Sequence, residues 1–227
     1  MSERSVTRSR TTRTRIFALL AGGLVIGVGA TATLATWSDN EWVFGGATGN
    51  NPGLGTSTFE VQQNRGGGWQ DIETAPGGIL TFTGTPLALS PGETVYTQVS
   101  LQTTAGTTDA GTLALLNAIP APAPVPASDT ALWNALDLRV VVTPTLGTDP
   151  MPACGAATFT TGTPDFVLGA AGTPSDFDTD GTGTEALLAA SANTFHYCFE
   201  ITLPTGSLDT LQGLRVAPAW QFHAESV

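Results

Sequence analysis

One stretch near the C-terminal end of the chain limits its fold more than any other. In residues 195–201 large apolar and polar side chains alternate at every position. One face would carry Phe195, Tyr197, Phe199 and Ile201, and the other would carry His196, Cys198 and Glu200. A period of two residues indicates a β-strand with one face in a core, and it does not fit a helix.

Similar strand-like stretches, separated by turn residues, recur along the chain. They are residues 58–62, 79–83, 94–102, 111–115, 136–142, 156–160, 195–203 and 213–223. Pro218 interrupts the last one, which predicts an edge position or a bulge there. Short helices are predicted over 128–136 and 184–190, and the proline-rich run 119–126 is interpreted as a surface connection. The pattern predicts an all-β protein, a jelly-roll-like two-sheet antiparallel sandwich with one or two short helices.

The charge is distributed unevenly along the 227 residues. The chain has no lysine, and five of its eight arginines lie within the first 15 residues. After Thr36, three arginines stand against 18 acidic residues, a net charge of −15. Such a surface repels phosphate backbones, so nucleic acid is not an expected partner.

The N-terminal segment has the organisation of an export signal. A basic region, residues 1–15, precedes an apolar region, residues 16–36, and we expect the two to form a hydrophobic signal helix. The uncharged run is long enough to cross a bilayer, so two interpretations remain: a cleaved signal peptide or a retained membrane anchor. We expect residues 37–227 to form one extracellular domain. Its two cysteines, Cys154 and Cys198, are interpreted as one disulfide, with two buried thiols as the alternative.

The string GATATLATWSDNEW, residues 29–42, resembles the junction of the alternate, SipW-type signal peptides. These are found on the TasA and camelysin family of biofilm-fibre proteins and on actinobacterial alternate signal-mediated exported proteins. The resemblance implies cleavage by a dedicated signal peptidase between Thr36 and Trp37. It also implies a jelly-roll-like sandwich. The turn Leu89-Ser90-Pro91-Gly92-Glu93-Thr94 and the closing strand around Trp220 are similar to the family at two further places.

By this resemblance, cleavage would free an aromatic, strand-prone segment that begins at Trp37. An assembly strand of Trp37, Trp42, Val43 and Phe44 could complete the sheet of a neighbouring subunit. The alternative is that it forms the first strand of its own sandwich. The resemblance therefore implies a secreted or cell-surface structural protein, a subunit of an extracellular matrix, biofilm or fibre, and a possible homo-oligomer.

An acidic loop is the sharpest local motif. Asp176, Asp178 and Asp180 alternate before Gly181, as at the start of an EF-hand loop, and Glu185 follows. Glu185 comes two positions too early for the bidentate ligand of an EF-hand. We favour a solvated acidic loop, with a weak calcium site as the alternative; no other cofactor is expected.

The residues carry little that indicates catalysis. His196 and His223 could meet as a metal pair if their strands were neighbours, but no zinc-helix spacing supports a camelysin-like metallopeptidase. No G-x-S-x-G motif is present. The tryptophans could form a sugar-binding platform, or they could be core residues. We therefore expect a non-enzymatic protein. The alternatives are a module that binds cell-wall polymer or carbohydrate and, after it, a secreted hydrolase.

Overall fold

The computed structural model describes residues 46–47, 51–52, 55–147 and 150–227. It divides into two compact units, Met1–Gly55 and Thr56–Val227. In the first unit, β1 (Gly46–Ala47) pairs antiparallel with β2 (Asn51–Pro52). The predicted cleavage site, Thr36 and Trp37, and the rest of the assembly strand, Trp42, Val43 and Phe44, lie outside the described residues. Within the described part of the chain, no helix has the length and apolar character needed to span a bilayer.

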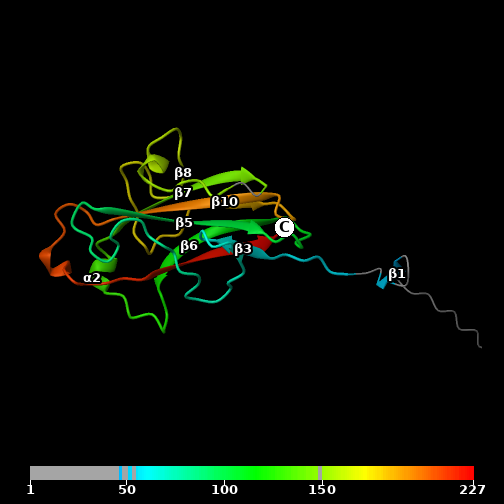
Figure 1. Cartoon of the computed structure of the whole chain (residues 1–227), viewed down its shortest axis with the longest axis horizontal. Helices are drawn as coiled ribbons and strands as arrows, with labels where there is room; N and C mark the ends of the chain where they lie inside the picture. The colour runs from blue at the N-terminus through cyan, green and yellow to red at the C-terminus, as the bar shows by residue number, and fades with distance from the viewer. Residues whose placement is uncertain (1–45, 48–50, 53–54, 148–149) are drawn as a thin grey trace, which may run out of the picture. The chain divides into compact units, whose positions relative to one another are not determined.

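The second unit is a sandwich of two antiparallel sheets (Figure 1). The larger sheet has the order β4 (Trp69–Gln70), β3 (Val61–Asn64), β5 (Thr94–Thr103), β10 (Asn193–Thr202), β7 (Asp137–Leu146) and β8 (Asp165–Leu168). The smaller sheet has the order β11 (Pro218–Ser226), β6 (Gly111–Pro120) and β9 (Glu185–Leu187). The predicted all-β two-sheet architecture is confirmed.

The core lies between the sheets, where the alternation in β10 predicts it. Phe199 and Tyr197 of β10 are at most 1% exposed. The Tyr197 ring lies 4.8 Å from that of Phe222, and the Phe199 ring lies 4.7 Å from that of Trp220. Both partners belong to β11, so the aromatic face of β10 is buried against the opposite sheet, where edge-to-face and tilted ring contacts add to the burial of apolar area.

The turn predicted from the sequence before residue 94 forms as expected. Gly92 has φ +91° and donates its N–H to Leu203 O, and β5 begins two residues later. Such a φ suits glycine because no side chain clashes there. The glycine run 66–68 joins β3 to β4 as a hairpin, with Asn64 opposite Trp69.

Three segments differ from their predicted state. Residues 156–160 were expected to be a strand, but Ala156–Phe159 form the 3-10 helix η1, because Cys154 is tethered to the sheet and Phe159 turns inward to pack on it. Residues 184–190 were expected to be helical, but Glu185–Leu187 form β9, whose Leu187 is fully buried. Residues 79–83 are not a strand, although Thr83 N–H bonds to Tyr96 O beside β5.

The remaining helical elements are short. Within the predicted helix 128–136, only Thr130–Trp133 form α2. Asp209–Leu211 form the 3-10 helix η2.

Pro218 opens an edge strand, as predicted. The register of β11 on β6 shifts between Trp220–Ala118 and Phe222–Leu115, so two β6 residues, Leu116 and Asn117, oppose one β11 residue. This is a β-bulge in β6, which leaves a backbone group there without its ladder partner.

Candidate functional site

Among the described residues, most of the buried polar side chains lie on the outer face of the larger sheet. Along β10 every residue from Asn193 to Ile201 is buried, so the polar face of the strand is covered as well as the aromatic face. The segment between β7 and β8, which contains η1, lies over this face and is held to it by a covalent bond.

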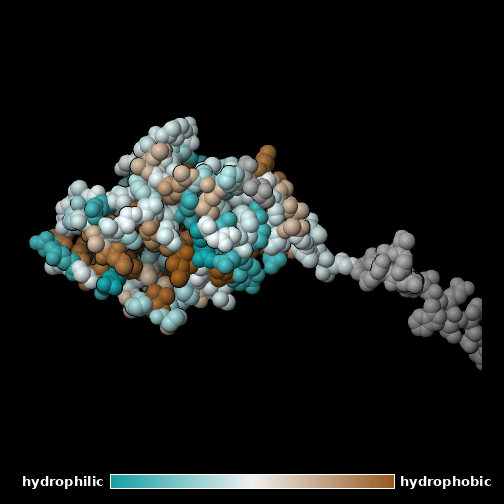
Figure 2. Space-filling view, viewed as in Figure 1, coloured by the Kyte–Doolittle hydropathy of each residue, from teal (hydrophilic) through white to brown (hydrophobic). Residues whose placement is uncertain are grey.

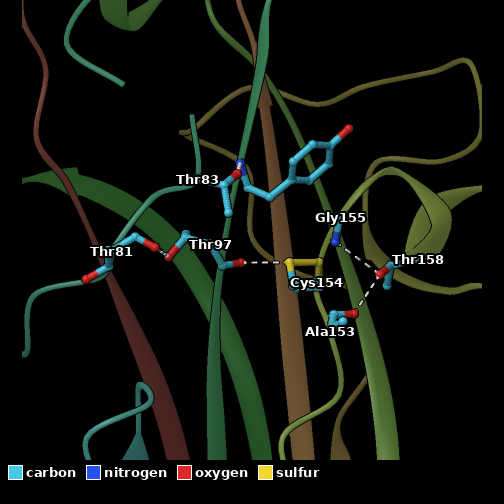
Figure 3. Close-up of a disulfide and its surroundings, with 9 residues drawn as sticks. Thr81, Thr83, Thr97, Ala153, Cys154, Gly155 and Thr158 are labelled. Carbon is cyan, nitrogen blue, oxygen red and sulfur yellow. Dashed lines mark hydrogen bonds between the residues drawn. A yellow bond between two sulfur atoms is a disulfide. The ribbon is translucent and has the colours of Figure 1, made fainter. Parts of the chain in front are cut away.

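That bond is the disulfide between Cys154 and Cys198, whose Cα atoms are 5.4 Å apart (Figure 3). It confirms the predicted pairing. Cys198, Val141 and Phe159 form a small second core on the outer face, with Tyr96 and Phe166 packed against it. Figure 3 shows Cys154 Sγ beside the carbonyl of Thr97 in β5, a contact of 3.1 Å. The disulfide thus ties the covering segment to the middle of the sheet.

An ion pair lies beside the disulfide. Arg139 Nε donates to Glu200 Oε1 at 2.7 Å, and the guanidinium carbon lies 5.3 Å from the centre of the Phe159 ring. Tyr96 also hydrogen-bonds Glu200. Burial, and then the charge of Glu200, raises the pKa of Tyr96. The arginine therefore neutralises Glu200 while its flat face packs under the covering segment.

A serine and a histidine are adjacent at the other end of the same face. Ser100 Oγ lies 2.6 Å from His196 Nδ1, and Thr145 Oγ1 lies 3.0 Å from His196 Nε2. A serine nucleophile needs an accessible Oγ and a group that orients its histidine, usually a carboxylate. Ser100 is 1% exposed, so its Oγ is closed to a substrate, and this arrangement suits a structural hydrogen-bond network.

A shallow hollow of about 210 Å³ lies at one end of this face. It is lined by Asp137, Arg139, Gly172, Pro174, Glu200 and Thr202. Burial raises the pKa of Asp137. Arg139 and Glu200 pair with each other, and Thr202 Oγ1 lies 2.8 Å from Thr94 Oγ1. Asp137 is the remaining carboxylate in the lining.

The acidic loop binds the protein's own backbone and side chains. Asp180 Oδ1 accepts the N–H of Asn117 at 2.8 Å. Asn117 is one of the two residues in the β6 bulge. Asp178 Oδ1 accepts the indole N–H of Trp133 at 3.0 Å, and Asp176 Oδ1 accepts the hydroxyl of Thr179 at 2.5 Å. The three carboxylates therefore serve three different donors.

The same loop joins the two sheets. Gly181 N–H donates to Leu115 O of β6, and Thr182 N–H donates to Val167 O of β8. A Cβ on Gly181 would lie 2.9 Å from Leu115 O, so only glycine fits this close approach. The motif that resembles a metal loop in sequence acts here as a connection along one side of the sandwich.

Glu185 lies in β9, outside that loop, and faces a different neighbour. Burial, and then the charge of Asp165 in β8, raises the pKa of Glu185. Among the described residues, no three His, Cys, Asp or Glu side chains come close enough together to hold a metal ion. The structure therefore does not bring Glu185 to the three aspartates, and the calcium interpretation gains no geometric support.

The histidines and tryptophans are also separated. His196 lies in the larger sheet, while His223 lies in β11 of the smaller sheet, 3.0 Å from Glu225, so the conceivable metal pair does not form.

Trp133 is buried, and Trp220 packs against Phe177 and Phe199. Neither belongs to an exposed sugar platform; Trp69 of β4 is half-buried.

Sequence reasoning did not find the two polar pairs on the outer face. Their register places Glu200 opposite Arg139 and His196 opposite Ser100. The alternation in β10 gave the only available signal, because it put His196 and Glu200 on one face.

The comparison with known proteins adds nothing to this picture: no family model and no curated protein matches the chain.

Proposed function

We propose that this chain is an exported structural protein of the cell surface or extracellular matrix. One observation carries the proposal: a sandwich closed by the Cys154–Cys198 disulfide follows a segment with the pattern of an export signal. Disulfides persist in oxidising compartments outside the cytoplasm. The signal pattern and the disulfide are independent features, and both support export.

The proposed mode of assembly is strand addition. After cleavage at Thr36–Trp37, the assembly strand Trp37–Phe44 of one subunit would add to a sheet of the next, giving a matrix or fibre subunit. A sandwich of two open sheets supports this mode because its edge strands have unpaired backbone groups. Binding of cell-wall polymer is the second candidate, but the burial of Trp133 and the partial burial of Trp220 in the core disfavour two of the aromatic residues that it would use.

Two measurements test the proposal. Mass spectrometry of the protein recovered outside the cell should give a mature N-terminus at Trp37; recovery of the intact chain from membranes would favour the retained anchor.

Electron microscopy of the mature protein should then show fibres, and a variant that lacks residues 37–44 should show none. Monomers only, at high concentration and with or without Ca²⁺, would overturn the fibre mechanism while leaving export untouched.

A further inference from the structure

The edge strand β11 is unusual among the sheet edges that the structure describes. The other three edges of the sandwich are short: β4 has two residues, β8 has four and β9 has three. β11 has nine residues and, among the described strands, pairs only with β6. Short edges are one way in which proteins avoid edge-to-edge association. By that measure β11 is the described edge most available to another strand.

The hydrogen bonds at the two ends of β11 show which groups are unpaired. Val227 N–H donates to Ala110 O, and Ala121 N–H donates to Ala217 O. In an antiparallel pair, residues that bond across the ladder alternate with residues whose groups point away. Phe222, Ala224 and Ser226 therefore direct their N–H and C=O groups to the free side. Pro218 lies in the same series, so its missing N–H is also on that side.

The outer face of β11 presents a histidine and a glutamate two residues apart, and the two side chains form a hydrogen bond. His223 and Glu225 are 50% and 71% exposed at their side chains, and their Nε2 and Oε1 atoms lie 3.0 Å apart. An antiparallel copy of this strand, related by a two-fold axis through Ala224, would place His223 opposite Glu225 of the second copy and Glu225 opposite its His223. Both contacts fall at non-hydrogen-bonded positions, where opposing side chains are closest.

We propose that two copies of this protein associate through β11, pairing β11 with β11 about Ala224 to join their smaller sheets into one. The interface is isologous, so it closes as a dimer. This dimer goes beyond the proposed fibre function and does not use the assembly strand. Phe222, Ala224 and Ser226 supply the backbone bonds, and the two His223–Glu225 contacts set the register.

The pairing of histidine with glutamate selects both this register and this occupant. A two-fold axis through His223 would place the two histidines opposite each other, and an axis through Phe222 would place Glu225 opposite Ala219. Neither gives complementary pairs. The assembly strand Trp37–Phe44 contains Asp39 and Glu41 and no basic side chain, so its carboxylates would bring like charge toward Glu225. A second copy of β11 offers a histidine–glutamate pair at both positions.

Sedimentation equilibrium of residues 37–227, which retain both sheets, tests the dimer across concentrations from about 1 µM to 1 mM. His223→Glu sets glutamate opposite glutamate twice, so it should weaken dimerisation about tenfold or more. The exchange variant H223E/E225H restores both pairs and should dimerise within about threefold of the unmodified chain. Thermal midpoints of the variants, whose substituted side chains are exposed, verify that each is folded.

Cross-linking tests the register separately. Oxidation of a mixture of H223C and E225C chains should join one of each, whereas H223C alone should not cross-link. A chain that stays monomeric at all these concentrations overturns the proposal, and so do equal dissociation constants for H223E and H223E/E225H. Self-cross-linking of H223C indicates the other register and also overturns it. Loss of the dimer on deletion of residues 37–44 would instead identify the assembly strand as the occupant of the edge.

Discussion

At the scale of single residues, the position of Asp180 in the sequence resembles that of a calcium ligand, but its carboxylate accepts a hydrogen bond from a backbone N–H. The bulge in β6 leaves the N–H of Asn117 without a partner in the ladder, and Asp180 accepts it. This hydrogen bond is exposed, so water can replace part of it, and its loss costs a modest amount of free energy. The role of Asp180 therefore follows from an irregularity in a strand that lies 63 residues earlier in the chain.

Replacing Asp180 tests this role. Asp180→Ala should lower the free energy of unfolding by about 0.5–1.5 kcal/mol, because the N–H of Asn117 loses its acceptor. Urea denaturation measures the change. Asp176→Ala removes an acceptor only for Thr179 of the same loop and should cost clearly less. If the Asp176, Asp178 and Asp180 variants instead lost one shared Ca²⁺-dependent stabilisation, the metal interpretation would be supported.

Glu185 gives a prediction about pH. Because burial and Asp165 raise its pKa in the folded state, its contribution to stability is present below its unfolded pKa and is lost as pH rises through the folded value. Glu185→Gln should therefore stabilise the protein near neutral pH and change little in more acidic solution, below the unfolded pKa. Thermal unfolding over this pH range gives the difference. Asp165→Asn should reproduce part of the gain, and a Glu185→Gln effect that does not vary with pH would contradict the assignment.

At the scale of elements, the covering segment between β7 and β8 is held to the sheet by three kinds of contact. The disulfide fixes Cys154, Phe159 packs on the outer core, and Arg139 lies against both Phe159 and Phe166. The outer face of β10 is buried as a result. A two-sheet sandwich usually leaves its outer faces to solvent, so this segment adds a partial third layer on one side.

Removal of the disulfide should show how much of this layer depends on it. The bridge joins cysteines 44 residues apart, so C154A/C198A should lose on the order of 4 kcal/mol of stability in the chain-entropy account. Urea denaturation with and without reductant measures the loss, and the reduced unmodified chain should match the variant. A loss below about 1 kcal/mol would mean that the packing of Phe159 and Arg139 holds the segment without the bridge.

At the scale of the whole molecule, charge is the dominant property. The second unit, residues 56–227, has three arginines, and two of them bind other groups of the chain: Arg139 pairs with Glu200, and Arg65 hydrogen-bonds Gln70 and Ile79 O.

Large exposed apolar side chains are distributed over separate loops and strand ends in the described residues: Ile79, Leu87, Ile119, Leu146, Leu188, Leu208 and Val227. On the face seen in Figure 2, brown apolar patches lie among teal polar areas and white areas of intermediate hydropathy.

The surplus of negative charge predicts a response to salt. Self-repulsion destabilises the compact state, and salt screens it over about 10 Å at 0.1 M. The thermal midpoint at neutral pH should therefore rise by a few degrees between about 10 mM and 300 mM NaCl. Near pH 4 many carboxylates are protonated and the rise should shrink. A midpoint that falls with salt at neutral pH would show that attractive charge pairs outweigh the surplus.

The sequence determined the architecture because local alternation is a property of neighbouring residues. The period of two in 195–201 fixed which face of β10 enters the core, and the turn at Pro91–Gly92 marked the start of β5. The paired cysteines determined the disulfide. Segments 156–160 and 184–190 were misassigned because their states depend on distant contacts, with the tethered Cys154 in the first and with β6 in the second.

The tertiary structure alone decided what the polar side chains do. Whether Asp180 binds a cation or the N–H of Asn117 depends on a bulge in another strand. Whether His196 meets His223 or Ser100 depends on which sheet each strand joins. The free edge at β11 likewise follows from strand order. A sequence records the spacing of residues along one chain, while these roles are set by the register between strands that are far apart in it.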